Sequence, residues 1–231
     1  MEKLLLLHGA LGSASDLQPV RIALEDVYDC VIFEFPGHGK THLGRSAFHI
    51  NGFAEALGDF VEQQGLAGCA VFGYSMGGFV ATKLQSQKAC FRSIYTLGTK
   101  FIWNPESSAK EASQLDAGAI EERFPAYASK LANQHTAMGW QQLLEATGQL
   151  MLQLGNETVV SDEDFRQLEI PIAVGLGDRD KMIPLADAVS IFKKLPKGCL
   201  DVLPYTQHPL DRLNLELLRS RLLSFFSTQT V

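Results

Sequence analysis

The sequence lacks long hydrophobic runs and any excess of positive charge. Its apolar opening, Leu4–Leu7, is shorter than the roughly 7–15 residues of a signal-peptide core, and no stretch approaches the roughly 18 continuous apolar residues of a membrane span. The 26 acidic residues outnumber the 20 basic ones, so the formal net charge is −6, and no basic stripe exists that could hold a phosphate backbone. We therefore predict a cytoplasmic protein that binds neither a membrane nor nucleic acid.

Cysteine is also scarce. The four cysteines stand far apart, with no C-x-x-C pair and no histidine at metal-ligand spacing: Cys30, Cys69, Cys90 and Cys199. Because such a set supports neither a zinc site nor a redox motif, we expect no metal and no organic cofactor. We interpret all four as small buried side chains. Internal repeats and low-complexity segments are absent as well.

What is present is a chain of 231 residues, long enough for one well-buried domain and too short for two without a visible linker. Short apolar runs alternate with stretches of helical apolar spacing, which is typical of a parallel sheet with crossover helices on both faces. The six predicted strands are Lys3–Leu7, Cys30–Phe35, Cys69–Gly73, Ser93–Leu97, Ile172–Leu176 and Leu200–Leu203. The predicted helices are Asp16–Val27, Phe48–Gln64, Met76–Lys88, Leu185–Leu195 and Leu210–Phe226.

One interval breaks this alternation. The stretch from Thr99 to Glu169 is too long for a single crossover and contains no strand-like run. We therefore predict a helical lid at residues 100–169, inserted into an α/β core of residues 1–99 and 170–231. A favourable helix start occurs at Asn104-Pro105-Glu106. Two predicted helical faces follow, one with Ile120, Phe124, Tyr127 and Leu131 and one with Leu143, Leu144, Thr147, Leu150, Met151 and Leu154.

A G-x-S-x-G motif stands between a predicted strand and a predicted helix, the context in which it indicates a nucleophilic serine at Ser75. The sharp turn strains the backbone there, so the positions two before and two after must be nearly free of side chains, as Gly73 and Gly77 are. The amides and positive dipole end of the helix stabilise a developing oxyanion. We expect Ser75 to be the nucleophile and the amide of Met76 to form half of an oxyanion hole.

A serine nucleophile needs a neighbouring base. Only two histidines follow Ser75, and His135 falls within the inserted helices. His208 lies in the loop after the last predicted strand, at the carboxyl edge of the sheet, where a base is expected. We predict that His208 is the base.

Two aspartates, Asp178 and Asp180, leave the end of the penultimate predicted strand, and either could orient the imidazole of His208. The loop after the first predicted strand can supply the second oxyanion-hole amide. We assign that amide to Ala10, with Leu11 as the alternative.

These motifs, in their order and across nearly the whole chain, resemble the α/β-hydrolase superfamily. The residues that carry the resemblance are His8-Gly9, Phe35-Pro36-Gly37-His38-Gly39, Gly73-Tyr74-Ser75-Met76-Gly77-Gly78, Gly177–Asp180 with Pro184, and His208. In that family the acid lies in a G-x-x-D-x-x-x-P stretch, which favours Asp180 over Asp178. The family's lid follows the sixth strand of an eight-stranded sheet. This chain begins at what would be the third strand, so the resemblance implies a trimmed, mainly parallel six-stranded sheet.

The early His8–Ser13 stretch and the compact size are also similar to a subgroup that includes the menaquinone-pathway synthase. That enzyme is a triad-bearing lyase acting on a carboxylate-rich substrate. The subgroup typically follows its nucleophile elbow with Arg, and Phe79 stands there in this chain.

The resulting prediction is a serine hydrolase that cleaves a carboxylic ester or thioester of a small molecule through an acyl-enzyme on Ser75. A triad-dependent lyase and a non-catalytic ligand-binding homologue are the alternatives. The predicted substrate-binding residues are Leu11, Trp103, Met138 and Trp140. We expect a monomer or a small homo-oligomer.

Overall fold

The computed structural model describes residues 1–44 and 48–227. Its six strands form one parallel sheet in the order β2-β1-β3-β4-β5-β6, which confirms the predicted fold class. The strands are β1 (Glu2–Leu7), β2 (Tyr28–Phe33), β3 (Ala70–Tyr74), β4 (Ser93–Leu97), β5 (Ile172–Gly177) and β6 (Gly198–Leu203). Two strands depart from their predictions: β2 begins and ends two residues earlier, and β6 begins two residues earlier.

Ten α-helices occur within the described residues. They are α1 (Gln18–Leu24), α2 (Ile50–Gln63), α3 (Met76–Gln87), α4 (Pro105–Ala112), α5 (Ala117–Arg123), α6 (Pro125–Gln134), α7 (Trp140–Asn156), α8 (Asp162–Arg166), α9 (Leu185–Phe192) and α10 (Leu215–Ser227). Short 3₁₀ turns, Ala14–Leu17 and Leu210–Arg212, precede α1 and α10. In this part of the chain, no helix combines the length and the apolar character needed to cross a bilayer.

The predicted C-terminal helix Leu210–Phe226 is wrong at its start. Leu213 is extended, with φ −68° and ψ 138°, and it separates the 3₁₀ turn from α10. The side chain of Asn214 then accepts a hydrogen bond of 3.0 Å from the amide of Leu217. A side chain that caps the first turn in this way starts a new helix there.

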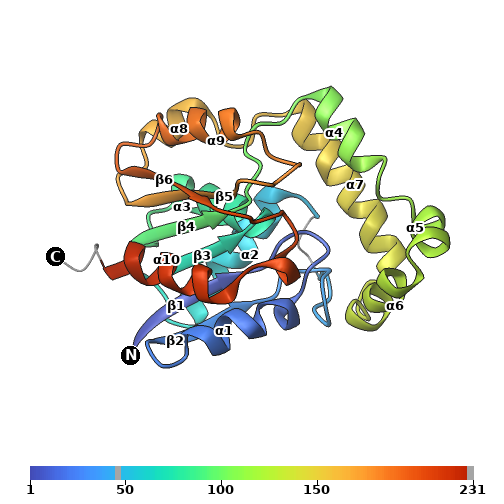
Figure 1. Ribbon diagram of the computed structural model, residues 1–231, viewed down its shortest axis with the longest axis horizontal. Helices are drawn as coiled ribbons and strands as arrows, with labels where there is room; N and C mark the ends of the chain where they lie inside the picture. The colour runs from blue at the N-terminus through green and yellow to red at the C-terminus, as the bar shows by residue number, and fades with distance from the viewer. Residues whose placement is uncertain (45–47, 228–231) are drawn as a thin grey trace.

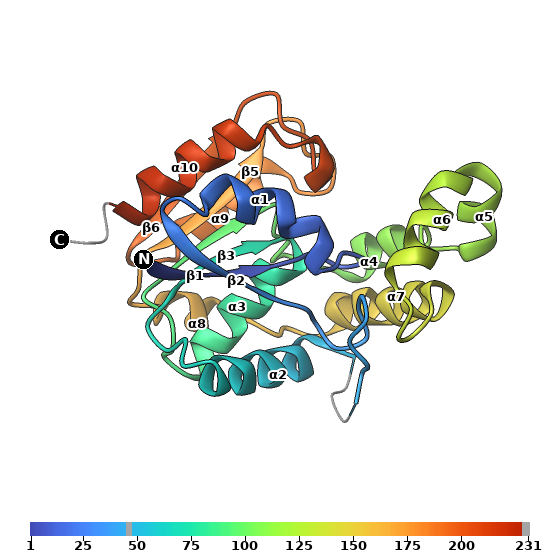
Figure 2. The same ribbon diagram turned by 90° about the horizontal axis from the view of Figure 1, so that it is seen from below.

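The absence of polar alternation in β1 follows from burial on both faces of the sheet. Leu4 and Leu6 face one core, to which α1 and α10 contribute, whereas Leu5 and Leu7 face the other, to which α2, α3, α8 and α9 contribute. Figure 2 shows α1 and α10 on one side of the sheet and α2 and α3 on the other. Helices cover both faces, so a strand in the middle of the sheet has no solvent-facing position.

The interval between β4 and β5 contains helices α4 to α8 and no strand among the described residues. Helices α4 to α7 gather beyond the end of the sheet that is opposite the N-terminus (Figure 1). Asn104 caps α4 as expected, because its side chain accepts a hydrogen bond of 2.8 Å from the amide of Ser107. The limits of this insertion as a separate lid stay a prediction.

One helical face predicted in the insertion is wrong. Ile120 and Leu131 are buried, but Phe124 is 61% exposed and Tyr127 is exposed as well. The reason is Pro125, which begins α6 and therefore ends α5 at the preceding turn, so the two halves of the pattern point in different directions.

The cysteines differ in burial. Cys69 is buried and Cys30 and Cys90 are partly buried, but Cys199 is exposed. The expectation of four buried cysteines is therefore wrong for Cys199. This residue lies on β6, an edge strand of the sheet whose side chains are mostly only partly buried, whereas those of the neighbouring β5 are all buried.

Candidate active site

The turn between β3 and α3 places Ser75 in a strained conformation. Its φ is 51° and its ψ is −117°, a backbone conformation that residues other than glycine rarely adopt. A Cβ atom on Gly73 would lie 2.5 Å from the Cα of Gly78, and one on Gly77 would lie 2.6 Å from the carbonyl oxygen of Leu7. Both positions therefore require glycine, as the motif predicted.

Two segments of backbone lie beside this serine. Met76 is the first residue of α3, so its amide has no carbonyl partner within the helix. The loop after β1 approaches from the other side, since a Cβ atom on Gly9 would lie 3.1 Å from the Cβ of Ser75. Ala10 follows Gly9 and lines one hollow together with Ser75 and Met76. Ala10 and Met76, the two residues predicted to form an oxyanion hole, therefore line the same hollow as the serine.

His208 is joined to Asp180 by a hydrogen bond of 2.7 Å between Nδ1 and Oδ2. The Asp180 side chain is 1% exposed, and its Oδ1 accepts hydrogen bonds from the amides of Met182 and Ile183. Burial alone would raise the pKa of Asp180, but the hydrogen bonds from His208 and from the two amides hold it below its ordinary value. A charged carboxylate only accepts, so Nδ1 carries the hydrogen and Nε2 remains able to take up a proton.

The loop that carries His208 is held from two sides. Asp178 Oδ1 accepts a hydrogen bond of 3.0 Å from the amide of Thr206, and the hydroxyl of Tyr74 donates one of 2.6 Å to the carbonyl of His208. The two candidate aspartates thus have different contacts. Asp180 contacts the imidazole, whereas Asp178 contacts the backbone of the loop.

Gly98, directly after β4, connects the serine and the histidine. The amide of Ser75 donates to the carbonyl of Leu97 at 2.8 Å, and the hydroxyl of Thr99 donates to the carbonyl of Ser75 at 2.9 Å. A Cβ atom on Gly98 would lie 3.3 Å from Cε1 of His208. The imidazole of His208 therefore packs against Gly98, whose neighbours Leu97 and Thr99 both form hydrogen bonds with Ser75.

Two hollows lie beside the loop after β1, and Ala10 lines both. The smaller one has a volume of about 40 Å³, and its lining is mostly apolar. It is lined by Ala10, Ile50, Ser75, Met76, Phe79, Lys100, Trp103, Leu150, Met151, Leu154 and Met182. Because a buried water needs roughly 10–15 Å³, this hollow holds only a few heavy atoms.

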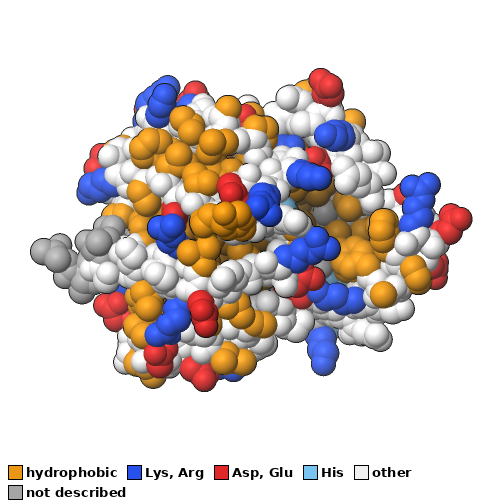
Figure 3. Space-filling view, viewed as in Figure 1, with side chains coloured by type: hydrophobic (Ala, Val, Ile, Leu, Met, Phe, Trp, Pro, Cys, Tyr) orange, Lys and Arg blue, Asp and Glu red, His pale blue; other side chains and the backbone are white. Residues whose placement is uncertain are grey.

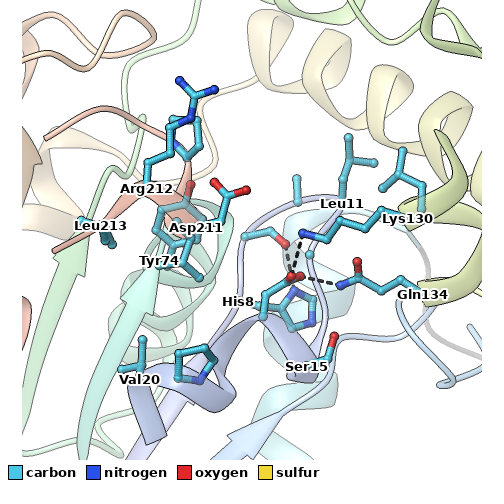
Figure 4. Close-up of a pocket in the computed structure, with 18 of the residues that line it drawn as sticks. His8, Leu11, Ser15, Val20, Tyr74, Lys130, Gln134, Asp211, Arg212 and Leu213 are labelled. Carbon is cyan, nitrogen blue, oxygen red and sulfur yellow. Dashed lines mark hydrogen bonds and ion pairs between the residues drawn. The ribbon is translucent and has the colours of Figure 1, made fainter. Parts of the chain in front are cut away.

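The larger hollow is a cleft of about 620 Å³ between the α/β core and α6. In Figure 4, Lys130 and Gln134 of α6 reach toward the turn that precedes α1, and Tyr74 and Asp211–Leu213 lie on the opposite side. Lys130 forms an ion pair of 3.1 Å with Asp16. Figure 3 shows this hollow on the surface, between the α/β core and the inserted helices, with Lys and Arg side chains along it. The cleft is therefore larger and more polar than the smaller hollow.

The structure separates the four predicted substrate-binding residues. Trp103 lines the smaller hollow, and Leu11 lines the cleft. Trp140 is buried in a cluster with Leu131 and Leu144, and neither it nor Met138 is among the residues that line the two hollows. Lys100 was not singled out in the sequence, although its place three residues beyond β4 at the carboxyl edge of the sheet was an available signal.

Three buried histidines lie in or beside the loop after β1. His8 donates from Nδ1 to the carbonyl of Gly9 and accepts at Nε2 from the amide of Phe35, so it is neutral. Burial lowers the pKa of His8 to about 4. Burial also lowers the pKa values of His38 and His135. Each of these histidines is therefore more easily protonated in the unfolded chain than in the folded one.

Acidification is expected to destabilise the fold through these residues. Between pH 6.5 and about 4, His8 takes up a proton in the unfolded chain but not in the folded one, so the free energy of unfolding falls as the pH falls. The contribution of His8 reaches about 3 kcal/mol at most. Urea unfolding between pH 7 and 4.5 measures this dependence. His8→Gln should make the unfolding free energy less dependent on pH, whereas His42→Gln, a control at an exposed position, should leave the dependence unchanged. An unfolding free energy independent of pH would contradict the role given to the buried histidines.

Comparisons with known proteins agree with the observed fold. A family model described as alpha/beta hydrolase fold matches residues 3–154. The structure superposes on a putative lipase from Acinetobacter baumannii AYE with a TM-score of 0.82 and 18% identity, covering 99% of this chain and 84% of that one. It superposes on a thermophilic esterase from Thermogutta terrifontis with a TM-score of 0.78 and 16% identity, covering 100% of this chain and 91% of that one. At these identities the likeness shows a shared fold.

One curated protein matches in sequence. Protein PHYLLO, chloroplastic, from Arabidopsis thaliana is 31% identical over 85 residues, which is 33% of this chain. The chain spans only 5% of the length of that protein. The match therefore concerns a small part of the larger protein.

Proposed function

The chain belongs to the alpha/beta hydrolase fold family, and from this premise we propose that it is a serine hydrolase that cleaves a carboxylic ester or thioester of a small molecule through an acyl-enzyme on Ser75. The observation that carries the proposal is the hydrogen bond of 2.7 Å from His208 to the buried, charged Asp180. It orients a proton acceptor at the end of the sheet where Ser75 occupies a strained turn. These are the parts that activation of a serine requires.

In the proposed mechanism, Nε2 of His208 takes the proton of Ser75 while the hydroxyl oxygen attacks the acyl carbonyl carbon. The amides of Ala10 and Met76 donate to the oxyanion, and Asp180 stabilises the imidazolium that forms. His208 then returns the proton to the leaving alcohol or thiol, which departs and leaves the acyl group on Ser75. Water, deprotonated by His208, cleaves this ester and restores the serine.

The two hollows fit the two halves of such a substrate. The leaving group receives its proton from His208, so it belongs on the side of the imidazole. Pro209, the next residue after His208, lines the large cleft, whereas Met76 lines the small hollow. We therefore assign the leaving group to the cleft and the acyl group to the small hollow.

A triad-dependent lyase acting on a carboxylate-rich substrate is less well supported. Such chemistry favours several cations facing the serine, and Phe79 lines the hollow where the synthase subgroup has Arg. Lys100 is the one charged side chain among the described residues that line this hollow. Steady turnover of a simple ester by the purified protein would favour the hydrolase over the lyase.

Labelling with a fluorophosphonate tests the nucleophile directly. The folded protein is expected to carry one phosphonyl adduct, on the peptide that contains Ser75, because only an activated serine reacts with this probe. Mass spectrometry of the digested protein locates the adduct. Ser86, on α3, the helix that follows Ser75, is the internal control and should stay unlabelled. Urea-unfolded protein should also stay unlabelled. A folded protein without an adduct on Ser75 would refute the hydrolase proposal.

A further inference from the structure

A lysine lines the apolar hollow at Ser75. Lys100 follows β4, and its side chain is only 8% exposed. The backbone before it is fixed to the serine turn, because Thr99 donates its hydroxyl hydrogen to the carbonyl of Ser75. The backbone after it is fixed by the indole of Trp103, which donates to the carbonyl of Lys100 at 2.7 Å. The position of this lysine relative to the serine is therefore well defined.

The ammonium group of Lys100 has only weak partners. Its Nζ lies 3.8 Å from Glu111 Oε1, beyond hydrogen-bonding distance, and 4.6 Å from the centroid of the Trp103 ring. The Glu111 side chain, on α4, is 15% exposed. An ammonium has three donors, and neither of these contacts is a hydrogen bond. A charge that is mostly removed from water is costly unless it is paired and hydrogen-bonded, so this ammonium favours an anionic acceptor in the hollow.

The hollow limits what that acceptor can be. Its volume of about 40 Å³ admits a short acyl group, and its other lining side chains are apolar apart from Ser75. A carboxylate at the far end of the acyl chain would meet the one cation there. A long alkyl chain would exceed the space and would leave the ammonium without an acceptor.

We propose that Lys100 is a specificity-determining residue that binds a carboxylate at the end of a short acyl group, so that the substrate is a half-ester or half-thioester of a short dicarboxylic acid. This inference rests on the proposed hydrolysis at Ser75 and names the substrate class of that site. The carboxylate accepts hydrogen bonds from the ammonium group, which lies over the Trp103 ring.

Paired benzyl esters test the proposal. Monobenzyl malonate, succinate and glutarate are each compared with a neutral ester in which a branched alkyl end replaces the carboxylate, such as benzyl 4-methylpentanoate for succinate. Wild-type protein is expected to show a higher kcat/KM for at least one half-ester than for its neutral counterpart. Lys100→Met should lower that ratio about 10- to 100-fold, the range of one charge-assisted hydrogen bond. Chromatography of the released benzyl alcohol measures both rates.

Two variants separate recognition from a structural role. Lys110→Met removes an exposed positive charge from α4 and should leave the ratio unchanged. Glu111→Gln removes the acidic neighbour of Lys100 and should preserve the preference for the half-ester. If Lys100 only anchors α4, Lys100→Met and Glu111→Gln would lower both rates equally. That result, or a wild-type preference for the neutral esters, would overturn the proposal.

Product binding gives a readout that does not depend on turnover. Succinate or glutarate is expected to raise the Tm of the wild-type protein but not that of Lys100→Met, and butanoate should raise neither. If no ester is cleaved, the hydrolase proposal fails, and this Tm shift alone decides whether Lys100 binds a carboxylate. Equal shifts in wild type and Lys100→Met would refute that binding.

Discussion

Replacing Ser75 with alanine is expected to reduce kcat for any ester that the protein cleaves by a factor on the order of 10⁴ to 10⁶. The loss is this large because no acyl-enzyme can form without the hydroxyl oxygen. We expect any residual rate to come from the proposed oxyanion hole, because the amides of Ala10 and Met76 would still polarise the carbonyl of a bound ester. Initial rates at saturating ester concentration measure the change.

The matched control for this variant is Ser86→Ala. Ser86 lies on α3, the helix that follows Ser75, and donates its hydroxyl hydrogen to the carbonyl of Lys83 at 2.9 Å. Its loss changes the surface of the helix and not the site, so activity should remain within about twofold of wild type. Ester hydrolysis that persisted at the wild-type rate in Ser75→Ala would show that another group attacks the ester.

The sequence was sufficient for the fold because both of its strongest signals come from local physical constraints. The uninterrupted leucines of β1 predicted a strand buried on both faces, and the structure has Leu4 and Leu5 in cores on opposite sides of the sheet. The strained turn at Ser75 excludes side chains from neighbouring positions, so its glycines mark it in the sequence. Parallel strands end at one edge, which is why residues far apart in the chain meet there.

The sequence was insufficient where side-chain direction decides the outcome. Trp103 and Trp140 both belong to the inserted segment, yet one lines the hollow at Ser75 and the other is buried between helices. Trp103 precedes α4 and Trp140 begins α7, and neither position in the sequence determines the direction in which the ring points. Lys100 had no periodic pattern at all, and its importance arises only from the segments that close around it.

The two aspartates after β5 show the same limit at a finer scale. They stand two residues apart, and chain order alone did not distinguish them. The distinction comes from the loop that carries Thr206 and His208, because Asp178 contacts its backbone and Asp180 contacts the imidazole. A pair of substitutions at these positions can therefore separate orientation of the base from stabilisation of the loop.

Asp180→Asn is expected to lower kcat about 10⁴-fold, whereas Asp178→Asn should lower it only a few-fold. An asparagine amide that faces Nδ1 of His208 can donate to it, which places the imidazole hydrogen on Nε2, the nitrogen that must accept the serine proton. In Asp178→Asn, the side-chain oxygen can still accept the amide hydrogen of Thr206. Rates of ester hydrolysis for the two variants, measured side by side, test the assignment.

Stability provides the control for this comparison. The pKa of Asp180 is below its ordinary value in the folded protein, so the charged carboxylate stabilises the fold at neutral pH, and this contribution is lost as the pH falls through the folded pKa. Asp180→Asn should therefore also unfold at lower urea concentration at pH 7, and its kcat must be measured under conditions where circular dichroism shows a folded protein. A folded Asp180→Asn protein with near wild-type kcat, beside an inactive Asp178→Asn, would transfer the orienting role to Asp178.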